Sequence, residues 1–310
     1  MKYFTHVPAG LKNKKVIFLV VFLIFMIVLF VFSNPFTSWI KNVFGLNELI
    51  DIAKDYPLSI YVLDVGKADA ILICIDDEYF MIDSGTYADG DKVEIALKKL
   101  GIEKLSAVFA THPDNDHIGG MAQILREFQC DKLVVPEIPK SVSSDTAEYE
   151  YLMKAVEERN VTLEVTEAGE YFALGDANME ILGPIGDHAG ANNYSLVMKL
   201  TFGEFSMLFT GDMEARAENA LCKSEINLEA NVLKVAHHGS KTSSTEEFLN
   251  RVKPECAVIS TGYDRSKLPR KEVLQRLENK NIDVFRTDID GTLLIAASLT
   301  KYEIFTEKPL

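Results

Sequence analysis

Two clusters of histidines, far apart in the sequence, constrain the fold of this chain more than any other feature. The first reads His112-Pro-Asp-Asn-Asp-His-Ile-Gly-Gly120, the second reads His237-His-Gly-Ser240, and Thr210-Gly-Asp212 lies between them. Imidazole and carboxylate groups together suit zinc, manganese or iron better than calcium or magnesium. A fold that uses both clusters and Asp212 must therefore bring three distant segments to one metal site.

The first cluster is expected at a turn between a strand and a helix. Residues 105–110 read as a short buried strand, and residues 118–128 have the apolar spacing of a helix. A single Asp at such a turn would most simply cap the helix. Two His and two Asp within six residues instead indicate a set of ligands. The predicted ligands of this cluster are His112, Asp114, Asp116 and His117.

Short strands alternate with helices beyond residue 58. The predicted strands lie near residues 59–64, 69–75, 78–82, 105–110, 132–135, 178–182, 195–201, 205–210, 231–235, 255–260, 282–286 and 292–297. The predicted helices lie near residues 91–100, 118–128, 145–158, 213–222, 244–251 and 270–279. Hairpins mixed with strand-helix units predict two mixed sheets that face each other, with helices outside.

Five further segments form an ordered set with the first cluster, and this set resembles the metallo-β-lactamase superfamily. The segments are residues 59–73, 80–85, 192–197, 208–212 and 233–240. The set is most similar to the ComEC-like branch, which holds the nuclease-like domains of bacterial DNA-uptake proteins, over about residues 58 to 306. The resemblance implies an α/β fold, the αββα four-layer sandwich.

The same resemblance implies roles for the later ligands. Asp212 should bridge two metal ions, and one of His237 and His238 should be a ligand. In the implied arrangement, one ion is bound by His112, Asp114 and one of these two histidines. The other ion is bound by Asp116 and His117.

Three residues are predicted to act in catalysis: Asp116, His238 and Asn193. Asp116 would orient the nucleophile, and whichever histidine of the second cluster is not a ligand would meet substrate or a carboxylate. Amides are poor ligands for transition metals, so Asn193 is expected to contact a substrate oxygen. Asp83 and Asp64 are predicted either to stand behind a ligating imidazole or to form plain turns.

The sequence departs from the family pattern at two places. Leu268 stands where relatives usually have a further site histidine, so one ion is held weakly, Asp264 substitutes, or Lys267 supplies the charge. Lys67 and Ala68 replace the Gln-Gly that is typical of the first segment. Because of these changes, an enzyme with a single metal ion and a degenerate enzyme both remain alternatives.

The N-terminal region predicts a membrane anchor. Residues 16–32 are seventeen apolar residues in a row, preceded by lysines, which favours one transmembrane helix with its N-terminus inside. A cleaved signal peptide is the alternative, but the run is longer than usual and no small-residue cleavage site follows. We expect a cytoplasmic basic segment at 1–15, a linker at 33–57 and a hydrolase domain at 58–310. The protein would then be a single-pass membrane protein with an extracytoplasmic domain.

The chemistry predicted for this site is hydrolysis assisted by one or two divalent ions, most simply zinc or manganese. A divalent ion lowers the pKa of bound water from 15.7 to roughly 7. The resemblance implies a phosphodiester substrate, such as single-stranded DNA or a cell-envelope polymer. A cell-envelope phosphoesterase of the phosphocholine esterase type and a catalytically degenerate binding module remain alternatives.

The net charge of −14 bears on the nuclease hypothesis. Residues 1–33 hold four Lys and no acid, so the rest has 32 − 4 = 28 basic against 46 acidic residues, a net of −18. Sequence-independent DNA binding draws on Lys and Arg contacts with phosphate, so such contacts must be local. The basic residues predicted near the rim of the site are Lys234, Lys241, Arg265, Lys267, Arg270 and Lys271.

Overall fold

The structure, a computed structural model, describes residues 45–140, 142, 146–263 and 265–308. The predicted basic segment, the anchor at 16–32 and the first part of the linker lie outside this range. Leu46–Leu310 forms one compact unit. Within the described part of the chain, no helix is long and apolar enough to cross a membrane.

Eight strands form the first sheet, in the spatial order β17-β16-β1-β2-β3-β5-β7-β8. In chain order they are β1 (Leu58–Val62), β2 (Ile71–Ile75), β3 (Glu78–Ile82), β5 (Ala107–Phe109), β7 (Lys132–Pro136), β8 (Thr162–Thr166), β16 (Leu293–Ala297) and β17 (Tyr302–Thr306). The pairs from β17 to β3 are antiparallel. From β3 through β5 and β7 to β8 the pairs are parallel.

Seven strands form the second sheet, in the order β15-β14-β13-β12-β11-β10-β9. They are β9 (Tyr171–Leu174), β10 (Ala177–Gly183), β11 (Val197–Phe202), β12 (Phe205–Phe209), β13 (Val232–Lys234), β14 (Cys256–Ile259) and β15 (Asp283–Arg286). The pairs between β9 and β12 are antiparallel. The pairs between β12 and β15 are parallel.

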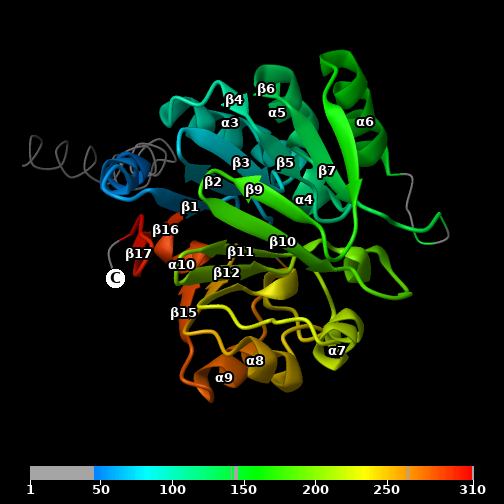
Figure 1. Ribbon diagram of the computed structural model, residues 1–310, viewed down its shortest axis with the longest axis vertical. Coiled ribbons are helices and arrows are strands. Elements are labelled where there is room, and N and C mark those ends of the chain that lie inside the picture. Colours follow the sequence, from blue (N-terminus) through cyan, green and yellow to red (C-terminus); the bar gives the residue numbers. More distant parts are fainter. Residues whose placement is uncertain (1–44, 141, 143–145, 264, 309–310) are drawn as a thin grey trace, which may run out of the picture. The chain divides into compact units, whose positions relative to one another are not determined.

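Helices cover the outer face of each sheet (Figure 1). Among the described residues after 57, the helices are α3 (Gly90–Lys99), α4 (Asn115–Ile118), α5 (Met121–Glu127), α6 (Ala147–Arg159), α7 (Ala215–Lys223), α8 (Glu246–Val252), α9 (Lys271–Glu278) and α10 (Thr287–Asp290). The same residues include the short 3₁₀ turns η1 (Tyr87–Asp89), η2 (Ala191–Tyr194) and η3 (Ala236–Gly239). The apolar sides of α3, α5 and α6 pack on the first sheet, and those of α7, α8 and α9 pack on the second.

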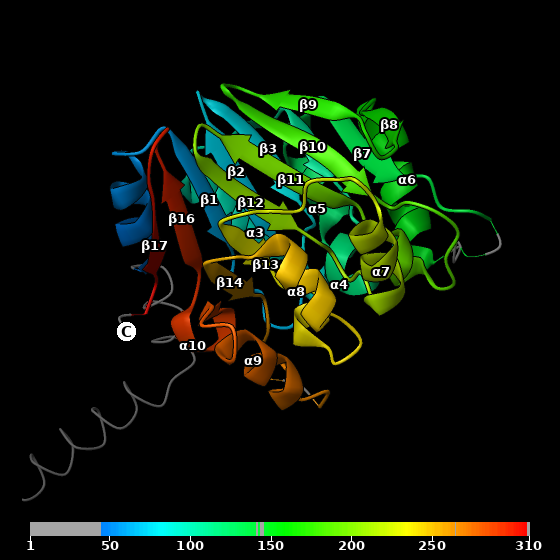
Figure 2. The same ribbon diagram turned by 60° about the horizontal axis from the view of Figure 1, so that its bottom comes forward.

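The strands bury apolar side chains on both faces, which makes four layers. In β1, Leu58, Ile60 and Val62 enter the core between the sheets, whereas Tyr61 enters the core under the helices. Side chains alternate along a strand, so a strand with both faces buried reads as a continuous apolar run. The turned view in Figure 2 shows the two sheets between their helices. This arrangement confirms the predicted αββα layering.

The strands that the sequence pattern does not predict are sheet edges or very short pieces. Strands β8 and β17 are the two edges of the first sheet, and β9 is one edge of the second. In β8, Leu163 and Val165 are 42% and 57% exposed. Edge strands are only partly covered, so their apolar pattern is weak. Strands β4 (Lys104–Leu105) and β6 (Gln129–Cys130) pair only with each other.

The end of the predicted linker packs against the domain. Residues 46–53 are helical, and Leu46 and Leu49 are buried in the core on the helix side of the first sheet. The last part of the predicted linker at 33–57 is therefore held on the domain by these two leucines.

The core between the sheets makes the first prediction. Phe205 is 1% exposed and packs there, with its ring centroid 5.3 Å from that of Tyr302. We expect Phe205→Ala to lower the free energy of unfolding by about 3 to 5 kcal/mol, because it leaves a cavity that the sheets cannot close. Urea unfolding measures this loss. Ile289→Ala, at a side chain 57% exposed, is the matched control and should cost less than about 1 kcal/mol.

Candidate metal centre

The predicted ligands lie after parallel strands of both sheets. His112 follows β5, Asp212 follows β12, and His237 and His238 follow β13. Parallel strands end on a common edge of their sheet, where ligands of open α/β sheets usually bind. The fold thereby brings together the three segments that the sequence predicts to meet.

The first cluster occupies the predicted turn between a strand and a helix. Asp114 precedes α4 with extended backbone angles (φ −78°, ψ 148°) and makes no capping hydrogen bond with its side chain. Gly119 is needed for close packing, because a Cβ atom there would lie 2.4 Å from the backbone nitrogen of Tyr87. The turn therefore holds its backbone tightly without using the Asp114 carboxylate as a cap.

The second cluster has an unusual backbone. His237 and His238 both have a φ of 52°, and Gly239 follows with a φ of +79°. Each left-handed residue other than glycine costs on the order of 1 to 3 kcal/mol and persists only where its surroundings enforce it. The turn directs His238 into the interior, where it is fully buried, and leaves 24% of the His237 side chain exposed.

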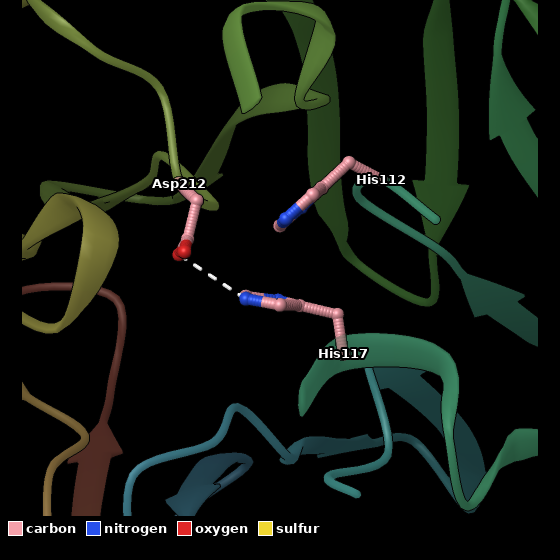
Figure 3. A group of neighbouring side chains, drawn as sticks. All are labelled: His112, His117 and Asp212. Carbon is pink, nitrogen blue, oxygen red and sulfur yellow. Dashed lines mark ion pairs between the residues drawn. The ribbon is translucent and has the colours of Figure 1, made fainter. Parts of the chain in front are cut away.

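Among the described residues, four overlapping groups of side chains have the geometry of metal ligands. Two of them contain Asp69, and the other two join the first cluster to the later segments. In the first ligand group, His112, His117 and Asp212 point toward one another (Figure 3), and one ligand atom from each lies within 4.8 Å of the other two. The second ligand group consists of Asp116, His117 and His238, by the same distance criterion. His117 Nε2 lies 3.1 Å from Asp212 Oδ1. The second ligand group pairs His238 with Asp116 and His117, whereas the resemblance implied that one of His237 and His238 shares an ion with His112 and Asp114.

The inward-facing atoms of these residues lack hydrogen-bond partners among the described residues. Five such buried atoms are His112 Nε2, His117 Nε2, His238 Nε2, Asp212 Oδ1 and Asp69 Oδ1. A buried polar atom without a partner costs about 1 to 3 kcal/mol. Three imidazole nitrogens and two carboxylate oxygens form a donor set that suits a divalent transition metal. The residues present therefore fit the ion that the predicted chemistry requires.

The opposite side of the His117 ring is held in place. Its Nδ1 lies 2.7 Å from Asp83 Oδ2, and that carboxylate also accepts hydrogen bonds from the backbone and side chain of Thr111. A carboxylate behind an imidazole fixes the tautomer and the ring orientation of a ligand. Of the two roles left open for Asp83, the structure shows this supporting one.

The other two buried rings are also anchored through Nδ1. His112 Nδ1 lies 3.1 Å from Thr111 Oγ1 and 3.4 Å from Ser195 Oγ. His238 Nδ1 lies 3.0 Å from the carbonyl oxygen of Ser260. All three rings thus use Nδ1 for support, which leaves Nε2 for a ligand.

Carboxylates and imidazoles in the site shift each other's pKa values. Burial would raise the pKa of Asp212, but the imidazoles of His117 and His238 outweigh it and hold that pKa well below its ordinary value. Burial would lower the pKa of His117, but Asp212 and Asp83 raise it well above its ordinary value. Anionic carboxylates therefore surround His117 and favour a proton or a metal ion on its imidazole.

A buried ion pair under the site was missed by the sequence analysis. Lys234 Nζ lies 2.9 Å from Asp69 Oδ2, with side chains 1% and 3% exposed. The sequence predicts Lys234 near the rim of the site, and the structure instead buries it in the core. The signal available in the sequence was its position inside an apolar strand, where a lysine requires a buried partner.

Two predicted ligands, Asp114 and His237, belong to neither ligand group, although each lies beside a residue of the first group. The Asp114 side chain is 42% exposed, and its Oδ2 lies 3.7 Å from His112 Nε2. His237 Nε2 lies 3.7 Å from Asp212 Oδ2, and its Nδ1 lies 3.6 Å from Glu214 Oε1. Both residues therefore line the mouth of the site.

Asn193 does not direct its amide at the site. Its Oδ1 accepts hydrogen bonds from the backbone nitrogens of Glu214 and Ala217 at the start of α7, both at 3.3 Å. Its Nδ2 donates to the carbonyl oxygen of Ala189 at 3.0 Å. The amide is used to hold this helix end, so the structure gives no support to the predicted contact with substrate.

The loop after β14 differs from the family pattern as the sequence indicates. Leu268 brings no ligand atom, and its carbonyl oxygen accepts a hydrogen bond from Thr261 Oγ1 at 3.0 Å. The proposed substitute Asp264 lies outside the described residues. Asp64 is the second carboxylate predicted either to stand behind a ligating imidazole or to form a turn. It accepts a hydrogen bond from the backbone nitrogen of Gly66 at 3.4 Å and thus forms a turn.

A small cavity lies beside His112. It measures about 80 Å³. Its wall is formed by Ala110, His112, Pro113, Ile118, Val135, Pro136, Ile138, Tyr149 and Leu152. An apolar recess next to a polar centre is a typical place for an uncharged part of a substrate.

Comparison with known proteins agrees with this geometry. The model of the metallo-beta-lactamase superfamily matches residues 63–263, and the chain belongs to this superfamily. The solved structure of CmlA, a diiron beta-hydroxylase from Streptomyces venezuelae, shares the fold, with a TM-score of 0.52, 11% identity, and coverage of 77% of this chain and 54% of that one.

The curated relatives include competence proteins. ComE operon protein 3 of Bacillus subtilis is 34% identical over 75% of this chain and 32% of its own length. Competence protein ComA of Neisseria gonorrhoeae is 30% identical over 76% and 32%. The chain thus spans about a third of the length of these relatives. These matches confirm the resemblance to the ComEC-like branch.

The support behind His117 makes the second prediction. We expect Asp83→Asn to weaken binding of Zn²⁺ or Mn²⁺ about 10- to 100-fold, because the amide does not hold the imidazole as a carboxylate does. Competition with a chelator of known affinity measures this change. Asp64→Asn is the matched control, since the Asp64 carboxylate contacts Gly66 and Lys308, and it should change affinity less than twofold. Equal effects of the two variants would contradict the assignment.

The helix-end role of Asn193 makes the third prediction. We expect Asn193→Ala to lower the free energy of unfolding by about 1 to 2 kcal/mol, because two backbone nitrogens at the start of α7 lose their acceptor. Thermal or urea unfolding measures it, with metal affinity measured in parallel. Unchanged stability in this variant would contradict the structural role.

Proposed function

We propose that this protein is a metal-dependent phosphodiesterase that acts outside the cytoplasm. The observation that carries the proposal is the convergence of buried imidazole and carboxylate atoms without hydrogen-bond partners, in a chain similar to competence proteins. A superfamily whose members are typically metal-dependent hydrolases supports the reaction type. The likeness to DNA-uptake proteins supports phosphodiesters as the substrate class.

We propose that each of the two ligand groups binds a divalent ion, zinc or manganese. His112, His117 and Asp212 would hold one ion, and Asp116 and His238 would complete a second position beside it. Bound ions would activate water and polarise the scissile phosphodiester. Asp212 Oδ1 lies 3.1 Å from His117 Nε2 and 3.7 Å from His238 Nε2, so this carboxylate is placed between the two groups.

Asp116 would orient the attacking water. Its side chain is 19% exposed at the mouth of the site. Burial raises its pKa, but His238, His117 and Lys67 outweigh burial and hold the pKa far below its ordinary value. A carboxylate that stays ionised accepts a hydrogen bond from water and aims its lone pair. We therefore assign orientation of the nucleophile to Asp116.

The substrate is proposed to be single-stranded DNA or a short phosphodiester. Four of the basic residues predicted near the rim, Lys241, Arg265, Lys267 and Lys271, are exposed. The net charge of −14 disfavours broad contact with a polyanion, and this favours a small cell-envelope phosphodiester as the second candidate. Single-stranded DNA and a small phosphodiester should therefore be compared as substrates in the same assay.

The N-terminal segment is proposed to anchor the domain at the outer face of the membrane. The compact unit begins at Leu46, shortly after the apolar run at 16–32. The intervening residues reach at most about 45 Å when fully extended. Leu46 would therefore stay within about 45 Å of the end of the apolar run.

Activity of the full chain in detergent makes the fourth prediction. With Mn²⁺ or Zn²⁺ added, we expect hydrolysis of bis-p-nitrophenyl phosphate and of labelled single-stranded DNA, and a loss of about 100-fold or more in Asp212→Asn. Asp131→Asn, an exposed carboxylate paired with Lys104, is the matched control and should keep full activity.

The outcomes of this assay separate the hypotheses. Turnover of the small ester without cleavage of DNA would favour the envelope phosphoesterase. Absence of turnover on both substrates, with no metal bound by the wild-type protein, would contradict the enzyme and leave a binding module.

A further inference from the structure

Lys67 places a positive charge directly on the second ligand group. Its Nζ lies 2.6 Å from Asp116 Oδ2, and the side chain is 27% exposed. The same Oδ2 lies 3.5 Å from His238 Nε2. One carboxylate oxygen that the second ion needs is thus already within ion-pair distance of an ammonium group.

The backbone around Lys67 is fixed against the site. The backbone nitrogen of Asp69 donates to the carbonyl oxygen of Asp116 at 3.0 Å. Gly66 packs so closely on the loop after β14 that a Cβ atom at Gly262 would lie 2.6 Å from the Gly66 Cα. The lysine is therefore presented to Asp116 by a segment that is tied to both neighbouring loops.

The first ligand group has a different electrostatic setting. The ion pairs of Asp212 join it to the imidazoles of His117, His237 and His238. An imidazole can itself become a metal ligand through its ring nitrogen. A lysine ammonium carries no lone pair and remains a competing cation. The two groups should therefore differ in their affinity for a second positive charge.

We propose that the Lys67 ammonium is a resident cation of the second ligand group and competes with the second metal ion for Asp116. This inference rests on the proposed metal site. One divalent ion then binds tightly in the first group, and the second binds weakly because it must displace a unit charge held a few ångströms away. The long side chain and its partial exposure allow the ammonium to withdraw, so the second ion is weakened and not excluded.

The test is a Mn²⁺ titration of the full chain in detergent, with free Mn²⁺ counted by electron paramagnetic resonance. For the wild type we expect two dissociation constants at least about tenfold apart. Lys67→Gln, which removes the charge, should tighten the weaker one about tenfold or more. Lys67→Arg keeps the charge and should keep the wide separation. Lys253→Gln, at an exposed lysine paired with Glu229, is the control for charge alone.

Thermal unfolding of each variant without metal accompanies the titration and shows that the fold is intact. An unchanged or weaker second constant in folded Lys67→Gln would overturn the role of Lys67 while leaving the metal site in place. Equal tight binding of two ions by the wild type would overturn it as well. Absence of Mn²⁺ binding by the wild type would instead contradict the proposed metal site itself, and the inference with it.

Discussion

The structure around the site depends on one constraint, which is that buried imidazoles and carboxylates face one another with too few hydrogen bonds. His112, His117, His238 and Asp212 direct unpartnered atoms to one region. A cation satisfies these atoms at once, because imidazole nitrogen and carboxylate oxygen are both metal ligands. The anchored Nδ1 atoms and the left-handed turn at His237 and His238 then make sense as the means that hold the ligand atoms inward.

Much of the fold and part of the site could be predicted from the sequence because the information is local. Strands with two buried faces, such as β1 and β5, are short apolar runs, and the turn after β5 places His112 and His117 together. The edge strand β8 was missed because Leu163 and Val165 are partly exposed and its pattern is weak. The burial of His238 and the partial exposure of His237 depend on backbone angles that no residue pattern encodes.

Long-range pairs explain the remaining differences between prediction and structure. Asp69 and Lys234 are 165 positions apart and form an ion pair inside the protein. The sequence around either residue does not identify its partner. Removing one member of such a pair leaves an unpaired buried charge, which is strongly destabilising. Asn193 was assigned to substrate from its place in the family motif, whereas its contacts with the start of α7 appear only once both segments are folded.

A crystal structure of the protein grown with Mn²⁺, with anomalous scattering recorded at the manganese edge, tests the central claim most directly. We expect an anomalous peak about 2.0 to 2.2 Å from His112 Nε2, His117 Nε2 and a carboxylate oxygen of Asp212, with these rings in the orientations described. A map without a peak among these residues, with the imidazoles turned to protein partners instead, would contradict the account.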